Sequence, residues 1–178
     1  MKTLYIDTHY KNVCIALYND EILIRKEEVS DKQNNSEFIF PAIVKVLNDE
    51  KFDEIVVING PGSFTGVRLG VTIAKTFAYT LNIPIKTITA LKAIAISNNA
   101  LKVAIFDNNG YFVGSFDNSF NENDDYKYIN KEDFDNDGFL VDGLINTDLV
   151  IKYMKNVEPT DSHMVNPIYV KKIGVEID

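Results

Sequence analysis

The stretch Gly60-Pro61-Gly62-Ser63-Phe64-Thr65-Gly66-Val67-Arg68-Leu69-Gly70 joins an apolar run to a helical one and is the most informative segment of this sequence. The run before it, Glu54–Asn59, is typical of a buried strand, and the residues after it predict a helix over Val67–Asn82. The stretch is not a Walker A sequence, because no Gly-Lys-Ser/Thr closes it, and Thr65 stands where a dinucleotide-binding loop has its third glycine. From the residues alone, it is either a tight strand-to-helix turn or a loop that binds an anion at the helix N-terminus.

Working outward from this loop, short apolar or alternating runs predict an α/β protein. In the first hundred residues we expect strands over Thr3–Asp7, Val13–Tyr18, Glu21–Val29, Glu54–Asn59 and Pro84–Ile88, and helices over Ser36–Asn48, Val67–Asn82 and Ala90–Ser97. The second half predicts strands over Lys102–Asp107, Tyr111–Phe116 and Pro167–Lys172, and a helix over Asn146–Lys155. Both halves begin with a strand that ends in aspartate, Asp7 or Asp107, followed by a polar turn and a second strand. This similarity suggests a duplication with a reduced second copy, and therefore two lobes, 1–100 and 101–178.

The charges of the chain are strongly localised. The chain has 178 residues and a formal net charge of −8. Between Asp107 and Asp142 ten acidic residues face only Lys127 and Lys131, so this one stretch carries the whole net charge and the rest of the chain is neutral. Such a balance argues against a general nucleic-acid-binding protein. A single cysteine, Cys14, cannot form an intrachain disulfide, and no apolar run approaches the length of a membrane span, so we expect a cytoplasmic protein.

The two long helices predicted in the first half have little polar surface. The helix after the loop places Gly66, Gly70, Ala74 and Ala78 at four-residue spacing, which gives one face that another backbone can approach closely. Either a second layer of the same chain covers these helices, or they form an interface with a partner. We favour the interface and expect it to contain Phe38, Ile39, Ala42, Ile43, Val46, Arg68, Gly70, Val71, Ala74 and Ala78.

The string from Gly60 to Gly70 closely resembles the signature of the bacterial TsaB (YeaZ) family. Further similarity lies in Leu4-Tyr-Ile-Asp-Thr8, in Ser36-Glu37 followed by Pro41, and in the ending Asn166-Pro-Ile-Tyr-Val-Lys-Lys172. The resemblance covers the first hundred residues well and the tail weakly. It implies the actin/Hsp70/sugar-kinase (ASKHA, RNase H-like) fold, here with a complete first lobe and a reduced second lobe, and a structural role for Gly60, Pro61, Gly62, Ser63, Thr65 and Gly66.

Members of this family resemble non-catalytic paralogues of TsaD, the subunit that forms N6-threonylcarbamoyladenosine in tRNAs reading codons that begin with A. The resemblance implies that the chain pairs helix to helix with a TsaD-like protein and with itself when isolated, that a TsaE-like ATPase joins the pair, and that tRNA is met only through the complex. ATP and metal are then expected on the partner subunits rather than on this chain.

The catalytic relatives bind a metal through a His-x-x-x-His pair, and the matching positions here are Ala90 and Ile94. The only histidines are His9, which we expect in a solvated turn, and His163, so no catalytic residue and no metal site is predicted. Asp7 and Asp107 stand where ATP-using relatives place Mg²⁺ and phosphates, and they are candidates for a residual nucleotide site. The alternatives are a self-associating binding module of the same fold and a degenerate ATPase or M22-peptidase-like protein.

Overall fold

A computed structural model describes residues 1–10, 12–30 and 35–171 of the chain. Five strands form the first sheet in the order β3-β2-β1-β4-β5, with β1, β2 and β3 antiparallel and β4 and β5 parallel to β1. The strands are β1 Lys2–Asp7, β2 Asn12–Asn19, β3 Ile22–Ser30, β4 Glu54–Ile58 and β5 Ile85–Ile88. All five lie within a few residues of the predicted runs. The side chains of β1 and β4 are almost all buried between the two helical layers, whereas those of the edge strand β3 are exposed or half-buried.

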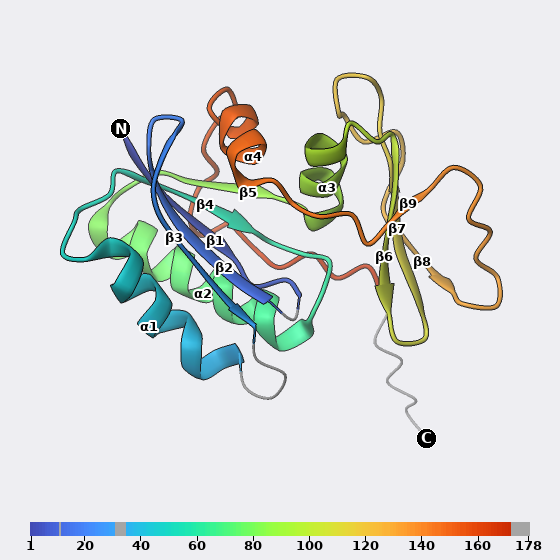
Figure 1. Cartoon of the computed structure of the whole chain (residues 1–178), viewed down its shortest axis with the longest axis horizontal. Helices are drawn as coiled ribbons and strands as arrows, with labels where there is room; N and C mark the ends of the chain where they lie inside the picture. Colours follow the sequence, from blue (N-terminus) through green and yellow to red (C-terminus); the bar gives the residue numbers. More distant parts are fainter. Residues whose placement is uncertain (11, 31–34, 172–178) are drawn as a thin grey trace.

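Helices cover both faces of this sheet (Figure 1). On one face lie α1 Asn35–Leu47 and α2 Phe64–Leu81, and on the other lie α3 Ala90–Asn98 and α4 Thr147–Met154. The buried residues of α1, namely Ile39, Ala42, Ile43 and Val46, recur at the spacing of a single helix face, which explains how α1 packs on the sheet. Within residues 1–10, 12–30 and 35–171, no helix combines the length and the apolar character needed to cross a membrane.

The second sheet repeats the first four strands of the first sheet in order and direction. Its order is β8-β7-β6-β9, with β6, β7 and β8 antiparallel and β9 parallel to β6. The strands are β6 Lys102–Asp107, β7 Gly110–Ser115, β8 Lys127–Asn130 and β9 Leu140–Val141. In the described part of the chain, this sheet has no fifth strand, which agrees with a reduced second copy.

The end of the chain returns to the first sheet. Helix α4 contributes Val150, Ile151 and Met154 to the core that covers β1, β2 and β4. Further on, Thr160 pairs with Ile85 of β5, and the Ile168 amide donates to the Asn59 carbonyl at 2.8 Å. The tail of the chain thus crosses the boundary predicted between 1–100 and 101–178, because α4, Thr160 and Ile168 contact the first sheet or its loop. The strand predicted over Pro167–Lys172 is wrong for residues 167–171, which form neither strand nor helix. Lys172 lies outside the described residues.

Candidate functional site

The glycine loop packs tightly against the turn that follows β1. The Ser63 amide donates to the His9 carbonyl at 2.6 Å, and the Thr8 hydroxyl donates to the Gly66 carbonyl at 2.7 Å. A Cβ atom at Gly62 or Gly66 would collide with the carbonyl oxygen of His9 or Thr8. Close backbone approach therefore accounts for these glycines without any ligand.

The Asp7 carboxylate at the end of β1 is bound from within its own turn. Its Oδ1 accepts from the His9 amide at 3.1 Å and lies 2.6 Å from Nδ1 of the His9 ring, and its Oδ2 accepts from the Tyr5 hydroxyl at 3.4 Å. The prediction that His9 is solvated is wrong, because only 8% of its surface is exposed. Its ring binds Asp7, and the glycine loop covers the turn in which it lies. The carboxylate thus has an internal partner where a nucleotide site would need an open ligand.

Asp107, the second candidate for a residual nucleotide site, has a different partner. Its Oδ2 lies 3.6 Å from Nζ of Lys171, which also donates to the Tyr128 hydroxyl at 3.4 Å. Among the residues that the structure describes, no three His, Cys, Asp or Glu side chains come together in a way that could hold a metal ion. Asp7 and Asp107 therefore do not build a joint ligand set with other acidic or histidine side chains.

Cys14 pairs with Asp7 across β1 and β2 and is not activated as a nucleophile. Burial, and secondly the negative charge of Asp7, raise the pKa of the Cys14 thiol to about 12. A thiol with this pKa stays protonated at neutral pH, and only the thiolate reacts. Cys14 is a partly buried side chain that packs against the apolar core.

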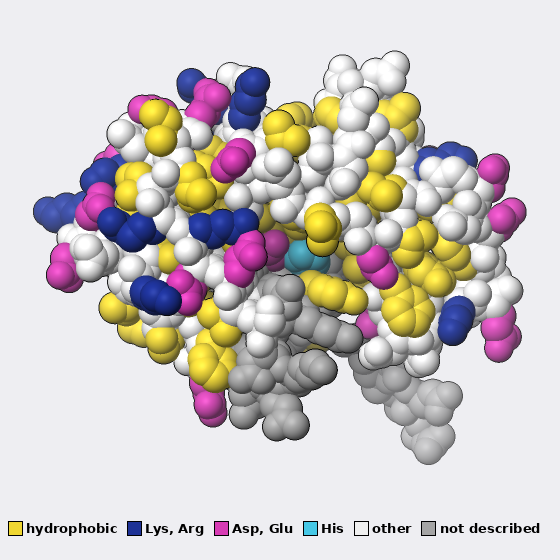
Figure 2. All heavy atoms as spheres, in the orientation of Figure 1, with side chains coloured by type: hydrophobic (Ala, Val, Ile, Leu, Met, Phe, Trp, Pro, Cys, Tyr) yellow, Lys and Arg dark blue, Asp and Glu magenta, His cyan; other side chains and the backbone are white. Residues whose placement is uncertain are grey.

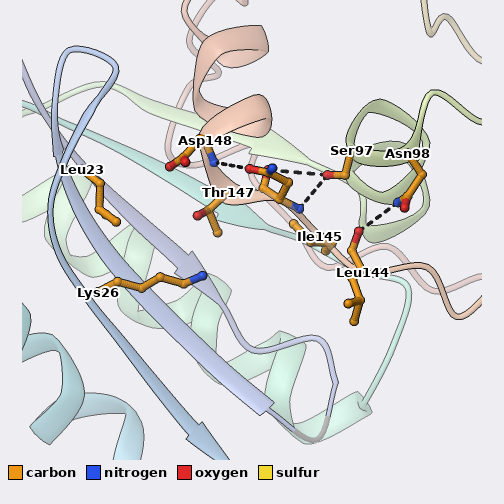
Figure 3. Close-up of a pocket in the computed structure, with 9 residues that line it drawn as sticks. Leu23, Lys26, Ser97, Asn98, Leu144, Ile145, Thr147 and Asp148 are labelled. Carbon is orange, nitrogen blue, oxygen red and sulfur yellow. Dashed lines mark hydrogen bonds between the residues drawn. The ribbon is translucent and has the colours of Figure 1, made fainter.

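A hollow of roughly 440 Å³ lies between the first sheet and the connection that leads to α4 (Figure 3). It is lined by Leu23, Lys26, Ser97, Asn98, Leu144, Ile145, Asn146, Thr147 and Asp148. Its two charged groups are already engaged, since Lys26 pairs with Glu28 and the Tyr18 hydroxyl lies 2.7 Å from Asp148 Oδ1. Sequence reasoning missed this hollow because its walls come from distant segments, and it presents no free catalytic group.

The predicted interface on α1 and α2 is mostly turned inward. Eight of its ten residues are buried in the chain's own core or against its own sheet: Ile39, Ala42, Ile43, Val46, Gly70, Val71, Ala74 and Ala78. A Cβ atom at Gly70 would collide with the Thr8 side chain, so the small-residue face serves the approach of α2 to β1 and its turn. The assignment of these eight residues to a partner interface is wrong; the second layer is the chain's own sheet. Only Phe38 and Arg68 remain exposed.

The outer surfaces of the same two helices are exposed and poor in charge. On α1, Phe40 and Val44 are 57% and 56% exposed, and Figure 2 shows hydrophobic side chains gathered over this helix. On α2, the Thr76 hydroxyl donates back to a carbonyl of its own helix, and the helix contains no acidic residue. Glu37 and Lys45 are the exposed charged residues of α1, and Arg68 is that of α2. We define the docking face by six of the uncharged exposed residues of the two helices: Phe38, Phe40, Val44, Thr72, Thr76 and Tyr79.

Arg68 lies at one end of α2 between two aromatic rings. Its guanidinium carbon is 4.0 Å from the ring centre of Phe64 and 5.5 Å from that of Tyr169, and Nε donates to the Tyr169 hydroxyl at 2.6 Å. In the described part of the chain no carboxylate pairs with this cation, and the aromatic rings hold it.

Comparisons with known proteins agree with this architecture. A family model described as TsaD, tRNA N6-adenosine threonylcarbamoyltransferase, matches residues 24–105. The tRNA threonylcarbamoyladenosine biosynthesis protein TsaB of Bacillus subtilis (strain 168) is 41% identical over 100 residues, which are 53% of this chain and 44% of that protein. The protein of the same name from Escherichia coli (strain K12) is 29% identical over 100 residues, covering 53% and 43%. The chain thus spans about half the length of the curated relatives it matches.

A solved structure described as YeaZ from Pseudomonas aeruginosa superposes with a TM-score of 0.75 at 16% identity, over 94% of this chain and 99% of that one. Together with the repeated strand order, this defines the chain as a protein of the ASKHA (RNase H-like) fold. Within that class, about half of the chain is similar in sequence to proteins named TsaB.

Proposed function

We propose that this chain is a non-catalytic subunit of the assembly that forms N6-threonylcarbamoyladenosine in tRNA, and that it acts by pairing with a TsaD-type catalytic subunit. The observation that carries the proposal is the 41% identity, over 100 aligned residues, to a protein named for this biosynthesis. The family model described as TsaD matches residues 24–105, which include the glycine loop, and this supports a common origin of the two partners.

Three features support a non-catalytic role. The Asp7 carboxylate is bound by His9, the Cys14 thiol is held protonated, and the positions of the catalytic metal ligands are taken by Ala90 and Ile94. Both of these α3 residues are buried in the apolar core, so that place in the fold is filled by packing. The chain is then expected to bind neither nucleotide nor metal on its own.

The docking face is the surface through which the chain pairs with the TsaD-type protein. Exposed aromatic and aliphatic side chains on two adjacent helices, with few charges among them, are what a stable protein interface buries. Without that partner, two copies of the chain pair through the same face. A TsaE-type ATPase joins the assembled pair, and tRNA is met through the catalytic subunit, because the net charge of −8 disfavours direct contact of this chain with a polyanion.

Binding of the purified chain to the TsaD-type protein of the same genome, measured by isothermal titration calorimetry, tests the proposal. Val44→Asp places a carboxylate in the docking face and should weaken binding at least tenfold. Leu144→Asp is the matched control, because Leu144 is 85% exposed in the second lobe, far along the chain from α1 and α2. Wild-type chain should also restore threonylcarbamoyladenosine in the tRNA of a TsaB-depleted strain, and Val44→Asp should not.

Two results would overturn the proposal. One is a tight dimer of this chain that the TsaD-type protein does not displace, which would favour a self-associating module. The other is ATP turnover by the isolated chain at a rate that Asp7→Ala abolishes, which would favour the degenerate ATPase.

A further inference from the structure

An exposed cluster of one arginine and two aromatic residues adjoins the docking face. Phe64 and Arg68 lie one turn apart at the start of α2, and Tyr169, from the irregular segment near the end of the chain, contacts both. Phe64 is 45% exposed and Tyr169 is 49% exposed, so the rings form an open platform rather than part of the core. Arginine and tyrosine on a small exposed platform are the composition of an interface hot spot.

The platform fixes Arg68 while leaving most of its hydrogen-bonding capacity unused. Its Nε donates to the Tyr169 hydroxyl and its plane lies over Phe64, but within the described residues neither terminal nitrogen has a hydrogen-bond partner. Arg25, the other arginine, is different: its Nε donates to the Val46 carbonyl at 2.7 Å, and its Nη2 binds the Leu47 carbonyl and Glu50. Arg25 is therefore bound within the chain through Nε and Nη2, whereas the two terminal nitrogens of Arg68 donate to no residue that the structure describes.

The charges around Arg68 indicate which kind of acceptor group its terminal nitrogens can bind. Helix α2 contains no acidic residue, so the nearest residues of its own helix offer no carboxylate. The planar fork of a guanidinium binds a carboxylate through two parallel hydrogen bonds. A phosphate has similar geometry, but the acidic stretch 107–142 of the same chain, which carries the net charge of −8, repels a nucleic-acid backbone at longer range.

We propose that Arg68, held between Phe64 and Tyr169, is the polar anchor of the docking face and binds a carboxylate side chain of the TsaD-type partner. This inference rests on the proposed function. The aromatic platform orders the arginine before binding, so little further side-chain entropy is lost when the partner docks. Tyr169 is a positioning residue: it holds the guanidinium through its hydroxyl and its ring.

Calorimetric titration of the TsaD-type protein with matched variants tests this anchor. Arg68→Ala should weaken binding about 30-fold, because the partner's carboxylate is left buried without its cation. Arg68→Lys keeps the positive charge but loses the planar guanidinium, so its affinity should lie between those of Arg68→Ala and the wild type. Lys152→Ala is the control: it removes an exposed cation from α4, which covers the other face of the sheet, and should change the affinity less than twofold.

The position of the partner's carboxylate can be found by reversal of charge. Arg68→Glu should abolish binding, and one Asp→Lys or Glu→Lys substitution in the partner should restore it. Each variant is compared with the wild type in thermal unfolding, so that a loss of fold is not mistaken for a loss of contact. Tyr169→Phe, which keeps the ring and removes the hydroxyl, should give a smaller loss than Arg68→Ala.

The possible failures are distinguishable. If Val44→Asp prevents binding and Arg68→Ala binds as the wild type does, the anchor is wrong and the proposed function stands. If the wild-type chain does not bind the TsaD-type protein, both are wrong. If Arg68→Ala leaves that affinity unchanged but reduces retention of purified total tRNA by the isolated chain, the arginine binds phosphate and the carboxylate assignment is overturned.

Discussion

Asp7 ends β1 at a place where the fold could present a carboxylate to a ligand. In this chain the Asp7 carboxylate is instead bound by His9. The aspartate is 5% exposed and the histidine 8% exposed, and their side chains lie 2.6 Å apart. A buried carboxylate without such a donor would lose its solvation with little compensation. The pair therefore works as a structural element of the turn.

His9→Ala should lower the free energy of unfolding by about 1–3 kcal/mol, since it leaves the buried Asp7 without its main side-chain donor. Urea unfolding monitored by circular dichroism measures the change. His163→Ala is the control, because His163 is exposed and its ring packs against the Tyr79 ring without an acidic partner among the described residues; an equal loss there would contradict the role given to the pair.

Cys14 should resist alkylation in the folded chain, because burial raises the pKa of its thiol from 9.0 to about 12. Iodoacetamide at pH 8 should modify the native chain far more slowly than the urea-unfolded chain, as measured by mass spectrometry. Since the folded pKa is the higher one, this group leaves stability unaffected below pH 9 and lowers it as the pH rises towards 12. Rapid alkylation of the folded chain would show that the thiol is accessible and activated.

At the scale of elements, α2 shows the limit of what periodicity predicts. The four-residue spacing of Gly66, Gly70, Ala74 and Ala78 correctly indicates a face for close approach, but not what approaches it. The answer is the turn after β1, where Thr8 packs on Gly70 and its hydroxyl donates to the Gly66 carbonyl. Substitutions on this face therefore disturb the fold itself.

Gly70→Leu should destabilise the chain by about 1–3 kcal/mol, because the added side chain has no space beside Thr8. Thermal and urea unfolding measure the loss. Thr72→Leu, two residues further along the same helix and exposed, should change stability by less than about 0.5 kcal/mol. A fully stable Gly70→Leu chain that no longer pairs with its partner would restore the small-residue face as an interface.

Much of the fold could be predicted from the sequence, and much of the site could not. Apolar runs such as Glu54–Asn59 identify the strands because a doubly covered sheet needs uninterrupted hydrophobic side chains. The Asp7–His9 pair depends on the shape of one turn, and Arg68 meets Tyr169 across 101 positions of sequence. Neither contact has a local pattern that would reveal it.

At the scale of the whole molecule, a buried ion pair joins the end of α4 to the first sheet. Lys86 of β5 lies 3.1 Å from Glu54 of β4, and its Nζ donates to the Met154 carbonyl at 3.0 Å. Glu54 also accepts from the Thr3 hydroxyl at 2.7 Å. Residues from β1, β4, β5 and α4 thus share one network, although they are up to 151 positions apart in the sequence.

Lys86→Met should destabilise the chain by about 3–5 kcal/mol, because it leaves the Glu54 carboxylate buried without its cation. The double variant Lys86→Met/Glu54→Gln removes the uncompensated charge and should recover part of that loss in urea unfolding. A double variant less stable than the single one would show that the network does not act through this charge pair.

The localisation of the acidic stretch gives the molecule an uneven electric field. Residues 107–142 carry the full net charge of −8 and lie in and around β7, β8 and β9, whereas α1 and α2 lie on the first sheet (Figure 1). A catalytic subunit already loaded with RNA would repel the acidic end and leave the helical end facing it. The two proteins would then be oriented relative to each other before their side chains come into contact, and the rate constant of their association would vary with ionic strength.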